Sequence, residues 1–144
     1  MNEIYLPFVM FLAILSGYFV SKGASEELKE LAVYLNYTYI ITASLVFGVA
    51  AYFNMWIAIL VTILIFCLLY FYNGRTMQNV ILFVSGVLLS FVKELFVFSV
   101  VLFINMMMLA SINYEKRFIK NVVVYLYFLI PALIVYLIKF FLRV

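Results

Sequence analysis

The residues best able to carry chemistry in this sequence are a lysine and a glutamate that stand side by side in an apolar run. Lys93 and Glu94 occupy the middle of LLSFVKELFVF. If one continuous helix carries this run, Ser90, Glu94 and Asn105 lie on one stripe, because eleven residues make three turns. A membrane glutamate beside hydroxyl and amide groups can take up and release a proton, as in coupled transporters. The pattern therefore allows a coupling or pore site made of Glu94, Lys93, Ser90 and Asn105.

The same two charges also fit a turn at the membrane surface. Neighbouring residues of a helix point about 100° apart, so Lys93 and Glu94 cannot neutralise each other on one. Inserting a lysine or an acid at the centre of a membrane helix costs about 2.5–3.5 kcal/mol. A turn in the headgroup layer removes that cost, and the lysine stem can extend to water. We therefore expect residues 77–112 to form two helices that are separated at Lys93 and Glu94.

The composition indicates that the elements positioning these residues lie in a membrane. The chain has 144 residues, of which 70% are hydrophobic and 10% are charged, whereas soluble domains average about 45–50% and about 25%. Too few polar residues are present to cover such a chain in water. Long unbroken apolar runs predict helices, since the strands of a membrane barrel alternate polar and apolar residues. The sequence predicts an all-α polytopic integral membrane helix bundle.

Six transmembrane helices are predicted, and five are the alternative. A span needs about 20 apolar residues, and the hydrocarbon core is about 30 Å thick. One helix over residues 77–112 would be about 54 Å long, so we divide it, although no Gly, Pro or Asn marks the turn. Asn54 marks a tight reversal earlier in the chain. The predicted spans, in a single bundle over residues 1–144, are 4–21, 31–53, 55–72, 77–92, 95–112 and 118–142.

The basic residues favour one orientation of the six-span chain. The loops at 22–30, 73–78 and 113–120 share one side and hold six of the nine Lys and Arg residues. The positive-inside rule makes this side cytoplasmic and places both termini outside. The richness in Phe, Ile, Tyr and Lys is typical of an AT-rich prokaryotic genome. We therefore expect the plasma membrane of a prokaryote.

Small residues recur on one face of each of the first two predicted spans. Such stripes let helix backbones approach closely in lipid. We expect the two stripes to form the contact between the first and second spans, and a homodimer interface is the alternative. The helix-packing candidates are Ala13, Gly17 and Ser21 on the first span and Ser44, Gly48 and Ala51 on the second.

The residues needed for common enzyme chemistries are missing from the sequence. It contains no histidine and no aspartate, and Cys67 is its single cysteine. Ser-His hydrolysis, aspartyl-type proteolysis and His-ligated metal or haem sites all lack their residues. We therefore expect no enzyme, no metal and no cofactor. No basic tract of the kind that tracks nucleic acid is present, so we expect no nucleic-acid partner.

Two main functions remain open. The first is a non-catalytic membrane-embedded subunit or scaffold that packs against a partner membrane protein, or against copies of itself, in the lipid bilayer. The alternative is a small oligomeric transporter or channel that uses Glu94 as its ion- or proton-coupling acid. A third, lipid handling, depends on Tyr34, Tyr37 and Tyr39 near Asn36, although an aromatic belt at the membrane surface also explains that cluster.

Overall fold

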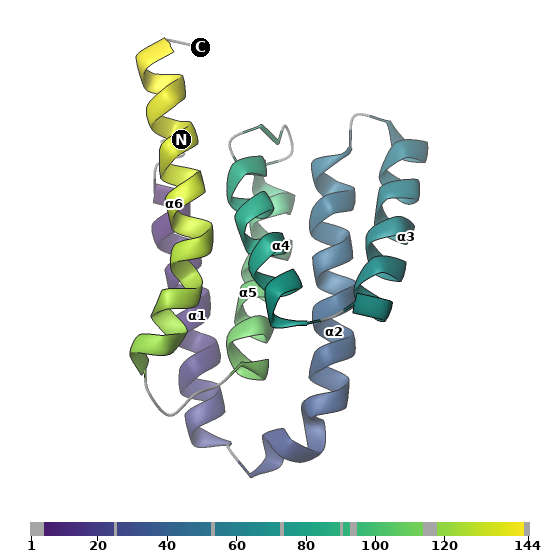
Figure 1. Ribbon diagram of the computed structural model, residues 1–144, viewed down its shortest axis with the longest axis vertical. Helices are drawn as coiled ribbons and strands as arrows, with labels where there is room; N and C mark the ends of the chain where they lie inside the picture. Colours follow the sequence, from purple (N-terminus) through teal and green to yellow (C-terminus); the bar gives the residue numbers. More distant parts are fainter. Residues whose placement is uncertain are drawn as a thin grey trace.

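The chain is built almost entirely of helix in the computed structural model. The structure describes residues 5–24, 26–52, 54–72, 74–89, 91–92, 95–113 and 118–142. Within these ranges the chain forms six α-helices and no strand (Figure 1). The helices are α1 (Leu6–Gly23), α2 (Glu27–Ala50), α3 (Met55–Tyr72), α4 (Arg75–Leu88), α5 (Leu95–Ile112) and α6 (Phe118–Leu142). The prediction of an all-α chain is confirmed.

Three of these helices are long and apolar enough to cross a membrane. Their qualifying stretches are Glu30–Ala50 in α2, Met55–Tyr72 in α3 and Val122–Lys139 in α6. The shorter apolar stretches are Phe8–Gly23 in α1 and Phe96–Ile112 in α5. Helix α4 has 14 residues, which corresponds to about 21 Å. Length and composition thus indicate membrane association through α2, α3 and α6.

The helices are arranged in two layers of unequal width. Figure 1 shows α1, α5, α2 and α3 side by side, with α6 in front of α1 and α4 in front of α5. Helix α5 packs between α1 and α2, and α4 packs mainly against α6. Helix α3 packs extensively only against α2, within the part of the chain that the structure describes. It therefore forms one edge of the molecule, where the second layer does not extend.

The segment 77–112 is divided as the charge argument predicts. Helix α4 ends at Leu88 and α5 begins at Leu95. The N–H groups of Phe91 and Val92 still donate hydrogen bonds to the Leu88 carbonyl oxygen, at 2.9 and 3.2 Å. The apolar run therefore continues as a turn after the regular helix has ended. The prediction of two helices is confirmed, and the single rod of about 54 Å is excluded.

The reversal between α2 and α3 is as tight as the sequence predicts. Helix α2 ends at Ala50 and α3 begins at Met55. The Asn54 side-chain oxygen accepts a hydrogen bond from the Trp56 N–H at 3.0 Å. This bond satisfies one of the N–H groups that every helix start leaves without a partner. Asn54 therefore both ends the turn and starts α3.

The two small-residue stripes pack against different helices, so their predicted pairing is wrong. A Cβ atom at Gly17 would collide with the Met107 carbonyl oxygen of α5, and one at Gly48 would collide with the Thr62 hydroxyl of α3. Ala13, Gly17 and Ser21 are buried, as are Ser44 and Gly48, whereas Ala51 is half-buried. Small residues determine how closely two helices approach but not which helix approaches. The small-residue stripes therefore could not predict that α5 packs between α1 and α2.

The core combines large side chains from the helices of both layers. Tyr39 of α2, Phe98 of α5 and Phe128 of α6 are fully buried, together with Met10 of α1 and Leu82 of α4. At a third close approach, a Cβ atom at Gly86 would lie 2.5 Å from the Phe128 carbonyl oxygen. Close packing of this kind provides the van der Waals contact that holds helices together in lipid.

Candidate functional site

Of the four predicted coupling or pore residues, Asn105 lies within the described residues. Helix α5 buries it against α2. Its Nδ2 donates hydrogen bonds to the Tyr39 carbonyl oxygen at 3.2 Å and to the Thr42 hydroxyl oxygen at 3.0 Å. The Thr42 hydroxyl donates in turn to the Thr38 carbonyl oxygen at 2.9 Å. Asn105 thus joins α5 to α2 through one polar side chain.

The remaining coupling or pore candidates, Lys93, Glu94 and Ser90, lie outside the described residues. The stripe that would connect Ser90, Glu94 and Asn105 requires one continuous helix. Because α4 ends at Leu88 and α5 begins at Leu95, helical spacing no longer places these residues on one face. That part of the hypothesis is wrong, and the physical reason is the interruption of the helix.

A lysine of α6 lies beside the connection between α4 and α5. The Lys139 ammonium is 4.8 Å from the centroid of the Phe91 ring. A cation over an aromatic face is attracted by the negative charge of the ring face, by about 0.5–1 kcal/mol at exposed sites. This contact joins the last turns of α6 to Phe91, in the turn that follows α4.

A pair of side-chain amides joins α4 to the residue that follows α5, and sequence reasoning missed it. Asn113 Nδ2 donates a hydrogen bond to Gln78 Oε1 at 2.7 Å, and Gln78 is buried. Both residues occur where the sequence pattern indicates loops. The signal that could have found them is their chemistry, since an amide near the end of an apolar helix needs a partner.

The buried polar groups are chemically suited to positioning helices. Amides and hydroxyls donate and accept hydrogen bonds but do not change charge in the physiological range. In membrane proteins such contacts between helices average about 0.6 kcal/mol and reach about 1.7 kcal/mol. Within the described residues, no group of three His, Cys, Asp or Glu side chains could hold a metal ion. The buried polar residues therefore fix the register of α2, α4 and α5.

The tyrosine cluster of α2 is divided between the interior and the surface. Tyr39 is fully buried, whereas Tyr34 and Tyr37 are exposed. The Tyr37 ring stacks on Tyr70 of α3 with centroids 6.5 Å apart, and Tyr70 stacks on Phe66 at 6.3 Å. These rings tie the lower parts of α2 and α3 together. Of the cluster, Tyr37 therefore joins α2 to α3 on an exposed flank.

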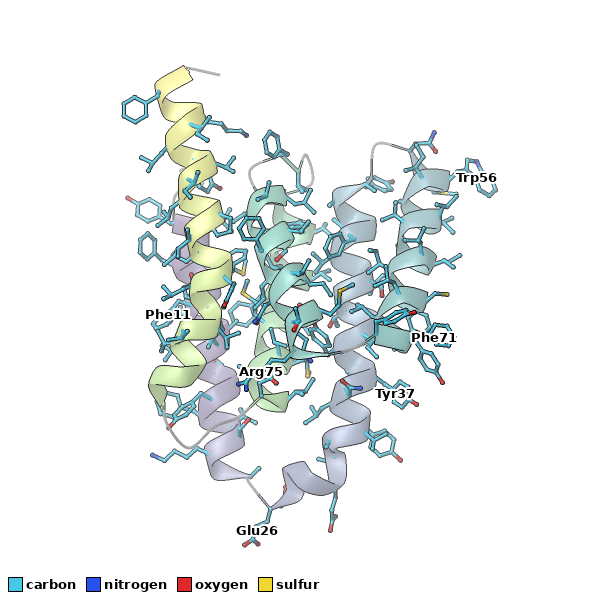
Figure 2. The ribbon with its side chains drawn as sticks, in the orientation of Figure 1. Phe11, Glu26, Tyr37, Trp56, Phe71 and Arg75 are labelled. Carbon is cyan, nitrogen blue, oxygen red and sulfur yellow. The ribbon has the colours of Figure 1, made fainter. Side chains whose placement is uncertain are left out.

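Helix α3 presents a row of exposed apolar residues on the face that points away from α2. Their spacing of four, four, three and four residues keeps them on one face, opposite the buried Ala58 and Leu69. Figure 2 shows Trp56 and Phe71 at the two ends of this face, pointing away from the bundle. We name this row the outer stripe of α3, and it consists of Trp56, Leu60, Leu64, Cys67 and Phe71.

A lateral groove of about 360 Å³ lies between α2 and α3, on a different flank of α3 from the outer stripe. Its lining includes the small residues Gly48 and Ala58 and larger side chains such as Leu45, Ile59 and Ile63. Its lining is almost entirely apolar. Sequence reasoning did not predict this groove, because it depends on which helix packs against Gly48.

Comparison with protein-family models, with curated proteins and with solved structures finds no match for this chain. The proposals that follow are therefore argued from the geometry of the chain itself.

Proposed function

We propose that this protein is a non-catalytic membrane-embedded subunit or scaffold that binds a partner membrane protein through the outer stripe of α3. The observation that carries the proposal is the position of α3 at the edge of the fold. The helix packs extensively only against α2 within the described residues, and large apolar side chains cover its opposite face. A helix of a partner protein would complete the layer on that side.

In this proposal the chain crosses the plasma membrane of a prokaryote six times, and α4 makes its crossing together with the turn that follows it. The successive ends of α1 and α2 and those of α5 and α6 lie toward one end of the molecule, and those of α3 and α4 lie between this end and the other, near the middle of α2 (Figure 1). Six of the nine Lys and Arg residues belong to the α1–α2, α3–α4 and α5–α6 connections or to the first or last turn of the helices that they join, so this end faces the cytoplasm. The α2–α3 and α4–α5 connections then face outward, as do both termini.

Packing, rather than hydrophobicity, would hold the partner. Lipid tails are as apolar as leucine, so exposure of an apolar face to lipid does not by itself favour association. Leu60, Leu64 and Phe71 recur at the spacing that lets two helices interlock at a crossing angle of about 20°. A partner helix with small residues on one face could approach this row closely. Affinity would therefore depend on shape, and truncating the row should weaken it.

Site-specific photo-crosslinking in intact membranes tests the proposal. The probe replaces Leu64 in the outer stripe, and the matched control replaces Leu12 of α1, because both leucines are 54% exposed. We expect one reproducible crosslinked protein from position 64 and only lipid adducts from position 12. Changing Leu60 and Phe71 to alanine should reduce the position-64 product. Equal products from both positions, or a monodisperse single species after mild solubilisation with no partner, would contradict the proposal.

Transport through Glu94 is the second proposal, and the buried amide of Asn105 favours it. A transport path needs polar groups inside the bundle, and Asn105 provides one at the α2–α5 contact. Protein purified into liposomes should then show proton or solute flux, and Glu94→Gln should abolish it. Flux that is unchanged in that variant would remove Glu94 from the mechanism.

A further inference from the structure

The three close-approach glycines each join two helices of the same layer. In the first layer, formed by α1, α5, α2 and α3, Gly17 lies against α5 and Gly48 lies against α3 (Figure 1). In the second layer, formed by α4 and α6, Gly86 lies against Phe128. Small residues let two helix backbones approach closely. The glycine contacts therefore hold each layer together but do not join one layer to the other.

Helices α4 and α6 are held together at two levels. A Cβ atom at Gly86 would lie 3.1 Å from the Cγ atom of Pro131 in α6. Eight residues further along α6, which correspond to about 12 Å, the Lys139 ammonium lies over the Phe91 ring, in the turn that follows α4. Two contacts at different levels resist rotation or sliding of one helix against the other. The two helices of the second layer therefore form one unit.

The contact between the layers is less extensive than the contacts within them, among the described residues. Helix α6 packs against α1, and α4 against α2, less extensively than α4 packs against α6. Tyr125 of α6 lies beside Phe11 of α1 with ring centroids 5.3 Å apart. Gln78 of α4 accepts the hydrogen bond from Asn113 at 2.7 Å. Regions with few buried contacts open at the lowest free energy, so the bundle should open between its layers before it opens within them.

Helical spacing places Tyr39 on the side of α2 that faces away from α3. Tyr39 stands nine residues before Gly48, which lies against α3, and nine residues make two and a half turns. The Tyr39 carbonyl oxygen also accepts a hydrogen bond from Asn105 of α5. Tyr39 thus lies at the junction of α2 and α5. The second layer lies over this junction, because α4 is in front of α5 and also packs against α2 (Figure 1).

The Tyr39 hydroxyl makes the closed arrangement of the layers less favourable. Tyr39 is fully buried, and its hydroxyl has no hydrogen-bond partner in the described part of the chain. A buried polar group without a partner costs about 1–3 kcal/mol. An arrangement in which water reaches the hydroxyl recovers that cost. Two conformations that differ by a few kcal/mol are both populated, the minor one at about 0.1–10%.

We propose that α4 and α6 move as one unit on the first layer and that this movement admits water to the Tyr39 hydroxyl. The described arrangement is the closed one, and the hydrogen bond between Gln78 and Asn113 favours it because it joins the two layers. The inference goes beyond both proposed functions, because neither the outer stripe of α3 nor Glu94 takes part in the movement.

Two buried positions can report the opening of the layers. Ser85 stands seven residues after Gln78, so it shares the face of α4 that meets the end of α5. Ala132 stands seven residues after Tyr125, so it shares the face of α6 that meets α1. Both Ser85 and Ala132 are buried. A cysteine at either position can react with a water-soluble reagent only when the layers separate.

Cysteine labelling of the full chain in a mild detergent tests the proposal. Ser85→Cys and Ala132→Cys, each in a Cys67→Ser background, are reacted with N-ethylmaleimide, and the rate of labelling measures the open fraction. Ser21→Cys is the matched control within the first layer. Ser21 and Ser85 are both buried, and each donates a hydrogen bond to a carbonyl oxygen of its own helix, at 2.7 and 2.9 Å. Circular dichroism checks that each variant keeps its helical content.

Two further substitutions should change the labelling rates in opposite directions. Tyr39→Phe removes the hydroxyl and should slow labelling at positions 85 and 132 by the same factor, about fivefold or more, which corresponds to about 1 kcal/mol. Gln78→Leu removes the hydrogen bond between the layers and should speed labelling at both positions by about threefold, the factor for a polar contact of about 0.6 kcal/mol. The rate at position 21 should respond to neither substitution.

Four results would overturn the proposal. Unequal factors at positions 85 and 132 would show that α4 and α6 do not move together. A rate that Tyr39→Phe leaves unchanged or raises would show that opening does not hydrate the hydroxyl. An equal response at position 21 would show that the whole bundle unfolds, and no labelling at 85 and 132 would show that the layers stay closed.

Discussion

Small residues lie at both the α1–α5–α2 contact and the α2–α3 edge, but the two regions differ in the number of neighbouring helices. At the first, Gly17 lies against backbone of α5, and Asn105 joins α5 to α2 by hydrogen bonds. At the second, Gly48 lies against the Thr62 side chain, and α3 has no extensive second contact among the described helices. In the first region α5 has a helix on each side. In the second, α3 has a helix on one side only, among the described residues. The difference teaches that small residues determine helix approach, whereas the number of neighbours determines whether a helix can still bind something else.

The largest expected difference is between two phenylalanines. Phe98→Ala in the core should lower the free energy of unfolding by about 3 kcal/mol, the low end for Phe→Ala, because a cavity remains while lipid supplies little transfer energy. Phe71→Ala on the outer stripe should change it by less than about 0.5 kcal/mol, as at other surface positions. Equilibrium unfolding in detergent micelles measures both. Equal losses of unfolding free energy would mean that Phe71 at the edge is packed as tightly as Phe98 in the core.

The close-approach glycines of these two regions, Gly17 and Gly48, give the next difference. Gly17→Ala should destabilise the fold by about 2–3 kcal/mol, since overpacking of a well-packed site costs about 1–3 kcal/mol and the Met107 backbone cannot rotate away. Gly48→Ala should cost about half as much, because the Thr62 side chain can turn and α3 can move outward. Thermal unfolding in one detergent compares the two variants. A larger loss of stability for Gly48→Ala would contradict this comparison, because α3 would then be held more rigidly against α2 than α1 is against α5.

The smallest of these effects concerns the polar contact between α2 and α5. Asn105→Leu removes two hydrogen bonds and should cost about 0.6–1.7 kcal/mol, the range for polar contacts between membrane helices. Thr42→Val removes one of them and should cost less, and the double variant should cost less than the sum because the residues interact. Full additivity in this double-mutant cycle would show that Asn105 and Thr42 do not act together.

The bounds of the helices could be predicted from the sequence better than the helix that packs against each of them. Long apolar runs and the charged pair Lys93 and Glu94 were enough to predict the division between α4 and α5. The cost of inserting a charge into the membrane can be read from the residue itself, without knowing which helices pack around it. The partners of Gly17 and Gly48 could not be derived, since any close helix satisfies a small residue. The Gln78–Asn113 hydrogen bond was missed for a similar reason: it joins a residue of α4 to the residue that follows α5.

The groove illustrates the same limit at a candidate site. Nothing in the residues around Leu45 or Ile59 distinguishes a wall of a groove from an ordinary lipid-facing surface. Gly48 lies against Thr62 of α3, and larger side chains of both helices, such as Leu45 and Ile63, also line the groove. The shape of the surface thus depends on tertiary packing.

The depth of residues 93 and 94 tests the central claim most directly, because the six-span arrangement and its orientation both depend on it. Lys93→Cys and Glu94→Cys, each in a Cys67→Ser background, are exposed in intact cells to a thiol reagent that cannot cross membranes. Leu64→Cys in the same background is the lipid-facing control. The account predicts ready labelling at 93 and 94 and none at 64. Protection of both positions would place the charged pair within the membrane, contradict the six-span arrangement and favour transport through Glu94.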